Sequence, residues 1–270
     1  MTDLSDKTAI VVGAAGRGNM GQAIARRLTE AGAHCVVAGR HEDALSELAR
    51  EIGGTPVICD FEDKASIDAL FDRAKEVAGS KGGHVDVAVN CTGWGLMKGW
   101  TEIEDSELKR ITALQFVGVH HFLAAALRVM GTEHGGRGGS IVNISSATTQ
   151  VPIFDHAAYI GTKAGAEALI RCFANQYGAQ GLRANTVSPG LTDTPMTADA
   201  MAAPGLKEAF EKEYPLGRIN TSEDIAHAVL WLADEGTFLT GQNLQANGGL
   251  TLRRNPTQDE IGASIAAHSS

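Results

Sequence analysis

The sequence predicts an α/β protein built on one doubly wound, parallel sheet. Short segments rich in valine and isoleucine alternate with longer amphipathic, helix-like segments from the first residues onward. The short segments do not alternate strictly between polar and apolar residues, as expected for strands covered on both faces. Strand–helix alternation of this kind predicts right-handed crossover connections between parallel strands.

The alternation runs through the whole chain, so we assign residues 1–270 to a single domain. Seven strands are expected at residues 8–12, 34–38, 55–59, 85–90, 140–144, 183–187 and 243–245. Helices are expected at residues 21–31, 42–52, 65–78, 105–130, 157–179 and 222–234. The glycine-rich stretch 131–139 reads as a loop, and the polar tail, residues 253–270, leaves open whether it is ordered or flexible.

The composition excludes several classes of partner. The net charge of −9 disfavours nonspecific binding to nucleic acid or to an anionic membrane. No continuous apolar run approaches the roughly 18 residues that a membrane span needs, and no signal-peptide pattern opens the chain. The four scattered cysteines fit a reducing compartment, so we expect a cytoplasmic protein with no metal site.

A glycine-rich turn follows the first expected strand. The segment from Gly13 through Gly18 to Gly21 lies between that strand and the first helix. Glycines let the backbone approach a phosphate closely, and the free N–H groups of a helix N-terminus favour an anion. A tight turn without a ligand is the alternative, but the position at the first strand–helix junction favours a dinucleotide pyrophosphate.

The end of the second strand bears on which dinucleotide is bound. NAD sites of this kind place an acidic residue there, whereas this chain has Gly39 followed by Arg40. The planar guanidinium of Arg40, together with Arg17 of the glycine turn, would suit a 2′-phosphate. We therefore favour NADP(H) over NAD(H), which remains possible if Glu42 or Asp43 binds the ribose.

Two segments carry a candidate catalytic group. Ser146 follows the strand at 140–144, at the sheet edge where ligands of parallel sheets bind. Tyr159 and Lys163 are four residues apart, on one face of the following helix. A nearby ammonium would lower the pKa of the tyrosine, so the phenol could exchange a proton with a carbonyl oxygen held by the serine. A nicotinamide would supply the hydride.

Together these motifs resemble the short-chain dehydrogenase/reductase family over nearly the whole chain. The resemblance implies a Rossmann-type domain with strand order 3-2-1-4-5-6-7, with Ser146, Tyr159 and Lys163 as catalytic residues. It also implies that Lys163 holds the nicotinamide ribose, that Asp60 lies near the adenine, and that the segment from Pro189 to Thr194 orients the carboxamide. The complete cofactor set is Gly13, Arg17, Gly18, Met20, Gly21, Arg40, Asp60, Phe61, Asn90, Gly93, Tyr159, Lys163, Pro189, Gly190, Thr192 and Thr194.

The chain departs from the family pattern at two places. The glycine turn is two residues longer than usual, and Gln115 stands where an asparagine of the proton relay is expected. Gln115 is either a relay member acting through water or a structural residue. A small-residue stripe at Gly161, Ala164, Gly165 and Ala168 packs onto the sheet or, as the resemblance suggests, pairs subunits in a homotetramer.

The predicted function is interconversion of a ketone and a secondary alcohol of a small molecule. An enoyl reductase is one alternative, although such relatives space the tyrosine and lysine further apart. A dinucleotide-binding regulator without turnover is the other alternative. Residues 196–214 are expected to form a helical lid, and residues after Gly93 and between Ser146 and Tyr159 either face the substrate or pack in loops.

Overall fold

The computed structural model describes residues 2–269 and contains one seven-stranded parallel sheet in the order β3-β2-β1-β4-β5-β6-β9. Its strands are β1 (Thr8–Val12), β2 (His34–Gly39), β3 (Thr55–Ile58), β4 (Val85–Asn90), β5 (Gly139–Ile144), β6 (Leu182–Val187) and β9 (Asn243–Leu244). Because β9 is the seventh strand of this sheet along the chain, its order is the predicted 3-2-1-4-5-6-7. The Rossmann-type architecture is confirmed.

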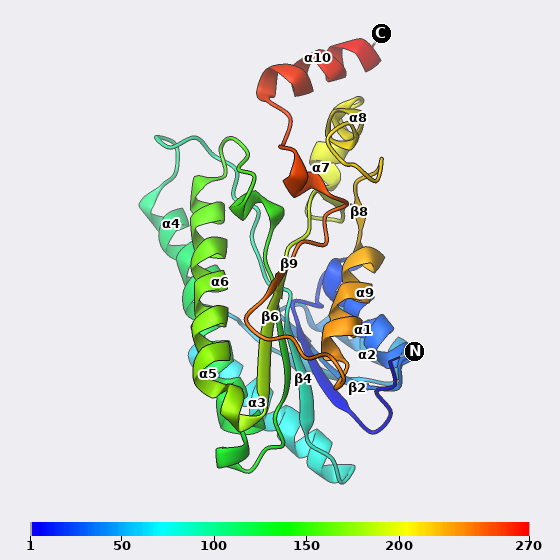
Figure 1. The fold of residues 1–270 in the computed structure, drawn as a ribbon, viewed down its shortest axis with the longest axis vertical. Helices are drawn as coiled ribbons and strands as arrows, with labels where there is room; N and C mark the ends of the chain where they lie inside the picture. Colours follow the sequence, from blue (N-terminus) through cyan, green and yellow to red (C-terminus); the bar gives the residue numbers. More distant parts are fainter. Residues whose placement is uncertain (1, 270) are drawn as a thin grey trace.

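Helices cover both faces of the sheet (Figure 1). They are α1 (Met20–Glu30), α2 (Glu42–Ile52), α3 (Lys64–Ser80), α4 (Asp105–Thr112), α5 (Gly118–Met130), α6 (Ala157–Tyr177) and α9 (Ser222–Ala233). Helices α1, α2 and α9 pack in one core cluster, and α3, α5 and α6 in another. Along β1, Ala9 and Val11 enter the first cluster, whereas Ile10 and Val12 enter the second, because successive side chains of a strand point to opposite faces.

The helix expected at 105–130 is continuous but irregular. A π-helical turn at Ala113–Val117 separates α4 from α5. Among residues 2–269 this is the helical segment long and apolar enough to cross a membrane by length and composition, although polar residues interrupt its apolar run. Buried residues make up 56% of its most apolar window. The segment is packed against α3, α6 and β4 as a core helix.

A smaller layer lies beyond the carboxyl edge of the sheet. It holds the two-stranded pair β7 (Thr192–Asp193) and β8 (Asn220–Thr221), and the helices α7 (Ala198–Met201), α8 (Leu206–Glu211) and α10 (Gln258–His268). The expected lid at 196–214 thus consists of two short helices. The tail after residue 253, whose order the sequence left open, forms α10, which packs against α8 (Figure 1).

Candidate active site

The predicted site residues gather at the carboxyl edge of the sheet. Gly13 follows β1, Arg40 follows β2, Asp60 lies two residues beyond β3, and Asn90 ends β4. Ser146 and Pro189 lie two residues beyond β5 and β6. In a parallel sheet all these ends point the same way, so residues far apart in sequence share one edge.

Tyr159 lies in the first turn of α6, facing the end of β5. The hydroxyl of Ser146 is close enough to the phenol to donate a hydrogen bond to it, which acts to lower the tyrosine pKa. The Ser146 hydroxyl also lies 2.8 Å from Oγ1 of Thr148. Ser146 and Tyr159, thirteen positions apart in the chain, are therefore brought together as the sequence predicted.

The neighbouring hydroxyl of Ser145 has a different place. It is buried and donates a 2.6 Å hydrogen bond to Oε1 of Glu167, which also accepts from Thr149 Oγ1 at 2.9 Å. Glu167 itself is only 9% exposed and lies one turn beyond Lys163 on α6. No sequence motif pointed to this carboxylate, which joins the end of β5 to α6 and so holds Ser146 near Tyr159.

Lys163 is held rigidly by backbone carbonyls. Its Nζ donates to the carbonyl oxygens of Ile144 at 2.8 Å and Thr92 at 3.2 Å, and only 5% of the residue is exposed. Nζ lies 5.8 Å from the centre of the Tyr159 ring. An ammonium has three donors, so one N–H remains for a further acceptor.

The ionisation of the pair differs from the sequence expectation. Burial raises the pKa of Tyr159 to about 12, and the Ser146 hydrogen bond opposes this only in part. Burial also lowers the pKa of Lys163 to about 8. The expectation that the ammonium lowers the tyrosine pKa is wrong for this structure, because desolvation outweighs the attraction and Nζ is directed toward the two carbonyls. The phenol is accordingly protonated near neutral pH.

The free energy of unfolding should carry a pH signature of Lys163. Between about pH 8 and its unfolded value of 10.5 the unfolded chain binds more protons than the folded protein, so the Lys163 contribution to stability increases as pH rises. Urea unfolding of the wild type and of Lys163→Met at several pH values between about 8 and 10 measures it. The difference in unfolding free energy, wild type minus variant, should grow with pH, and a constant difference would contradict a depressed lysine pKa.

Gln115 lies in the π-helical turn, and both of its polar atoms have partners. Oε1 accepts from the backbone N–H of Trp94 at 2.8 Å, and Nε2 donates to Thr162 Oγ1 at 2.9 Å. These bonds join the segment after β4 to α6. They are the contacts expected if Gln115 is a structural residue rather than a member of a proton relay. A relay role would need one of them to be exchanged for water.

The glycine turn has the shape of a phosphate cradle. Gly13 has a φ of +92°, and a Cβ there would lie 2.7 Å from the carbonyl carbon of Cys91. A Cβ on Gly21 would lie 2.5 Å from the carbonyl oxygen of Gly13. The turn therefore folds back on itself too tightly for a side chain at Gly13 or Gly21. With no side chains there, a pyrophosphate could approach the backbone at the start of α1.

Asn19, which the sequence analysis missed, braces this turn. Its Nδ2 donates to the Gly13 carbonyl at 2.8 Å, and its Oδ1 caps α1 by accepting from the Gln22 N–H at 3.0 Å. An asparagine directly before the helix was the available signal, since asparagine is a preferred N-cap residue.

Replacing Asn19 with alanine should lower the free energy of unfolding by about 1 kcal/mol, the usual cost of losing an N-cap. It should also weaken dinucleotide binding, because the Gly13 end of the turn loses its support. Chemical denaturation and fluorescence titration with NADPH measure the two effects. Asn175→Ala, on the exposed face of α6, is the control, and equal behaviour of the two variants would show that Asn19 has no bracing role.

The remaining cofactor candidates fall into exposed and buried groups. Arg17 pairs with Glu47 at 2.9 Å, and Arg40 lies 3.9 Å from Glu62 with half of its side chain exposed. Asp60 is also exposed. Met20, which opens α1, is half-buried.

Phe61 is 3% exposed and stacks in the core near Phe122, so only its backbone can reach a ligand.

Two strand ends provide backbone and polar groups near Lys163. Asn90 is buried, donates to Asn143 Oδ1 at 2.8 Å and accepts from both the N–H and the hydroxyl of Thr92. This fixes Thr92, whose carbonyl binds Lys163. A Cβ on Gly93 would lie 3.5 Å from Lys163 Nζ, so the backbone of Gly93 passes directly over the ammonium.

The segment after β6 is fixed in a similar way. The Pro189 carbonyl accepts from the Ala147 N–H at 2.7 Å, next to Ser146, and the Gly190 N–H donates to Asn220 at 3.2 Å. Thr192 Oγ1 donates to the Gly190 carbonyl, and the Thr194 N–H donates to Thr197. The segment therefore reaches the same edge as Ser146 and Tyr159.

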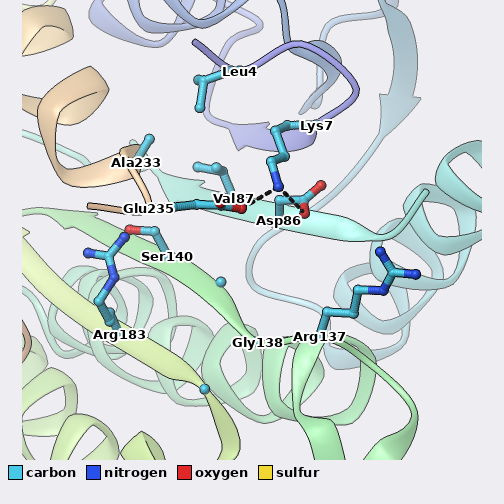
Figure 2. Close-up of a pocket in the computed structure, with 12 residues that line it drawn as sticks. Leu4, Lys7, Asp86, Val87, Arg137, Gly138, Ser140, Arg183, Ala233 and Glu235 are labelled. Atoms are coloured by element: carbon cyan, nitrogen blue, oxygen red, sulfur yellow. Dashed lines mark hydrogen bonds and ion pairs between the residues drawn. The ribbon is translucent and has the colours of Figure 1, made fainter. Parts of the chain in front are cut away.

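Two hollows lie outside the group formed by Ser146, Tyr159 and Lys163. One, of about 370 Å³, is at the opposite, amino edge of the sheet, where Lys7 pairs with Asp86 and Glu235 between Arg137 and Arg183 (Figure 2). The other, of about 380 Å³, runs along α9 and the segment from Gln245 to Gly249. Neither is lined by Ser146, Tyr159 or Lys163, so the assignment of the site rests on the geometry of the strand ends.

Residues 13–251 match a family model described as enoyl-(acyl carrier protein) reductase. The chain belongs to the short-chain dehydrogenase/reductase family. It is therefore an oxidoreductase of a family that uses NAD or NADP.

Relatives share about a third of their residues with this short-chain dehydrogenase/reductase. It is 34% identical over 262 residues to an NADP-dependent (R)-specific alcohol dehydrogenase of Lentilactobacillus kefiri, covering 93% of this chain and 99% of that protein. It is 32% identical over 265 residues to 3beta-hydroxysteroid dehydrogenase 1 of Eggerthella lenta, with 93% and 95% covered. The structure of a short-chain type dehydrogenase/reductase from Mycobacterium ulcerans superposes with a TM-score of 0.85 at 26% identity, covering 96% of this chain and 98% of that one.

Proposed function

We propose that this enzyme interconverts a ketone and a secondary alcohol, using NADP(H). The observation that supports the proposal most strongly is the convergence of the Ser146 hydroxyl, the Tyr159 phenol and the Lys163 ammonium at the end of β5. In this scheme the Ser146 hydroxyl binds the substrate oxygen, and Tyr159 exchanges a proton with it. The bound nicotinamide supplies or accepts the hydride.

The chain's own residues would position both reactants. The third N–H of Lys163 is proposed to hold the nicotinamide ribose, since its other two donors bind Ile144 and Thr92. The phenol, protonated near neutral pH, suits the reduction of a carbonyl, where it acts as the acid. Because these groups are held in one site, the hydride could reach the carbonyl carbon and the proton the carbonyl oxygen without rearrangement of the substrate.

A cofactor assay with a substrate panel tests the proposal. The purified protein is mixed with NADPH or NADH and with ketones or enones, and cofactor absorbance is followed. Oxidation of NADPH by ketones is expected. Binding of NADPH without turnover of any panel member would favour a dinucleotide-binding regulator.

An enoyl reductase remains the second candidate, because the matching family model carries that description. The four-residue spacing of Tyr159 and Lys163 weighs against it, since the family resemblance places these two residues further apart in enoyl reductases. Turnover of enones without turnover of ketones would decide for this candidate.

The NADP preference is proposed from Arg40 and Arg17. Arg40→Ala should weaken NADPH binding about tenfold to a hundredfold, because a guanidinium–phosphate hydrogen bond contributes about 1.5–3 kcal/mol, while NADH binding changes little. Titrations of both cofactors measure this. Arg50→Ala, an exposed arginine of α2, is the control. Equal loss for both cofactors would contradict the 2′-phosphate contact and favour Glu42 or Asp43 on the ribose.

A cytoplasmic location and a homotetramer complete the proposal. Of the small-residue stripe on α6, Gly161 and Ala164 are exposed and available to a second subunit. Gly165 is half-buried, and a Cβ there would lie 2.9 Å from the ring of Phe116. Ala168 is also half-buried. Two of the four positions of the stripe are therefore exposed for the proposed contact between subunits.

A further inference from the structure

The C-terminal helix α10 lies outside the region shared with the family. The family match ends at residue 251, before α10 begins at Gln258. The alcohol dehydrogenase of Lentilactobacillus kefiri is matched over 99% of its own length but over only 93% of this chain. The contacts of α10 therefore belong to this chain rather than to the common fold.

The segment leading into α10 binds the loop between Ser146 and Tyr159. Asn255 is 8% exposed, and its Nδ2 donates to the carbonyl of Val151 at 2.5 Å. At the start of α10, Nε2 of Gln258 donates to a carboxylate oxygen of Asp155 at 3.3 Å. Both acceptors lie on the short stretch of chain that connects the two proposed catalytic residues.

Asp155 transmits this contact to Tyr159. Its φ of +56° is unusual for a residue with a side chain, and its carbonyl accepts from the Lys98 N–H at 2.7 Å. The next residue, His156, packs its ring edge-on against Tyr159 with centroids 5.2 Å apart. The buried Nδ1 of His156 has no hydrogen-bond partner among the described residues, so the ring is held by its neighbours in the loop rather than by a bond of its own.

The other side of α10 fastens the lid helix α8. The hydroxyl of Ser264, 6% exposed, donates to the Gly205 carbonyl at 2.7 Å. A Cβ on Gly205 would lie 2.4 Å from the Ser264 carbonyl oxygen, so the two helices approach more closely than any other residue would allow. Ile261 packs beside Leu206 and Phe210 of α8.

Arg254 adds ion pairs at the base of the helix. It binds Glu260 through two hydrogen bonds of 2.6 and 2.7 Å and lies 3.7 Å from Glu213. These groups are exposed, so they contribute orientation more than stability.

We propose that α10 is a substrate-side cap that restricts the enzyme to compact substrates. This inference rests on the proposed ketone/alcohol function. Because α10 binds the loop of Val151 and Asp155 on one side and the lid helix α8 on the other, the two cannot move apart to admit a large substrate. Asn255 and Gln258 are therefore positioning residues, which act on the substrate site through the loop.

The proposal predicts a change in substrate range when the cap is released. The full-length double variant Asn255→Ala/Gln258→Ala should raise KM for a single-ring ketone about tenfold, equivalent to about 1.4 kcal/mol, with kcat changed less than about threefold. The ratio of kcat/KM for a multi-ring ketone to kcat/KM for the single-ring ketone should be higher in the double variant than in the wild type. The Kd of NADPH, measured without substrate, should stay as in the wild type. Asp259→Ala, on the exposed face of α10, is the matched control.

Hydrogen exchange followed by mass spectrometry provides a readout that needs no substrate. In the double variant, peptides covering residues 151–155 and 206–211 should exchange faster than in the wild type and in Asp259→Ala. The cap proposal would be rejected if exchange were unchanged in both peptides. It would also be rejected if exchange became faster but the substrate preference stayed the same. A third outcome separates the two proposals. If the wild type turns over no ketone, the ketone/alcohol function is rejected, and with it the restriction to compact substrates. Faster exchange in the double variant would then still show that α10 holds the loop in place.

Discussion

Replacing Tyr159 with phenylalanine should reduce kcat for ketone reduction by about a thousandfold while leaving NADPH bound. A positioned general acid contributes roughly 10²–10⁴-fold to rate, and the variant removes only the hydroxyl that carries the proton. The ring keeps its edge-on contact with His156, so the loop should stay in place. Steady-state kinetics and an NADPH titration on the same preparation test both halves of the prediction.

The control for this variant is Tyr177→Phe, at the other end of the same helix. Tyr177 packs against Phe173 and belongs to no proposed site, so its loss of a hydroxyl should leave kcat unchanged. Ketone reduction at the wild-type rate by Tyr159→Phe would show that another group delivers the proton, and the assigned mechanism would be rejected.

Replacing Gly13 with alanine should cause the largest loss of stability among single changes in the cofactor turn. An alanine at φ +92° is strained by about 1–2 kcal/mol. Its Cβ would lie 2.7 Å from the backbone of Cys91, which directly follows β4 and donates its N–H to the Val12 carbonyl at 2.9 Å. The turn would have to move away from the end of β4. We expect an unfolding free energy lower by about 3 kcal/mol or more and NADPH binding too weak to measure.

Gly18→Ala separates the two causes of this loss. Gly18 also has a positive φ, +69°, but a Cβ there meets no atom within 4 Å. The Gly18→Ala variant should therefore lose only the free energy that corresponds to the strain of an alanine at positive φ. Thermal or urea unfolding of both variants makes the comparison. Equal losses would mean that the close approach to Cys91 contributes nothing, and the phosphate cradle would lose its main structural support.

The opposite pKa shifts of Tyr159 and Lys163 have one cause and one consequence. Both side chains are removed from water, which disfavours the charged form of each and so raises the pKa of the phenol and lowers that of the ammonium. In the proposed mechanism the protonated phenol would therefore be the proton donor. The carbonyl groups of Ile144 and Thr92 accept hydrogen bonds from the buried ammonium, and the charge of Glu167 also favours its protonated form.

The sequence alone determined the framework of this protein. The strands at 8–12 and 85–90 and the helix at 42–52 have the boundaries that their hydrophobic patterns predicted. Such boundaries follow local patterns that repeat at fixed spacing, so residues close in the chain are sufficient to encode them. The spacing of Tyr159 and Lys163 belongs to this class. The order of the sheet was predicted only through the resemblance of the motifs to the short-chain dehydrogenase/reductase family.

Only the tertiary structure decided the contacts between segments far apart in the chain. Glu167 under Ser145, and Asn255 and Gln258 on the loop between Ser146 and Tyr159, have no signature in their own neighbourhoods. The N-cap position of Asn19 could be read from the sequence, but its bond to the Gly13 carbonyl could not. The pKa of Tyr159 was predicted in the wrong direction for the same reason. Burial and partner choice depend on how every segment packs, whereas a sequence motif specifies only which residues are available to be buried.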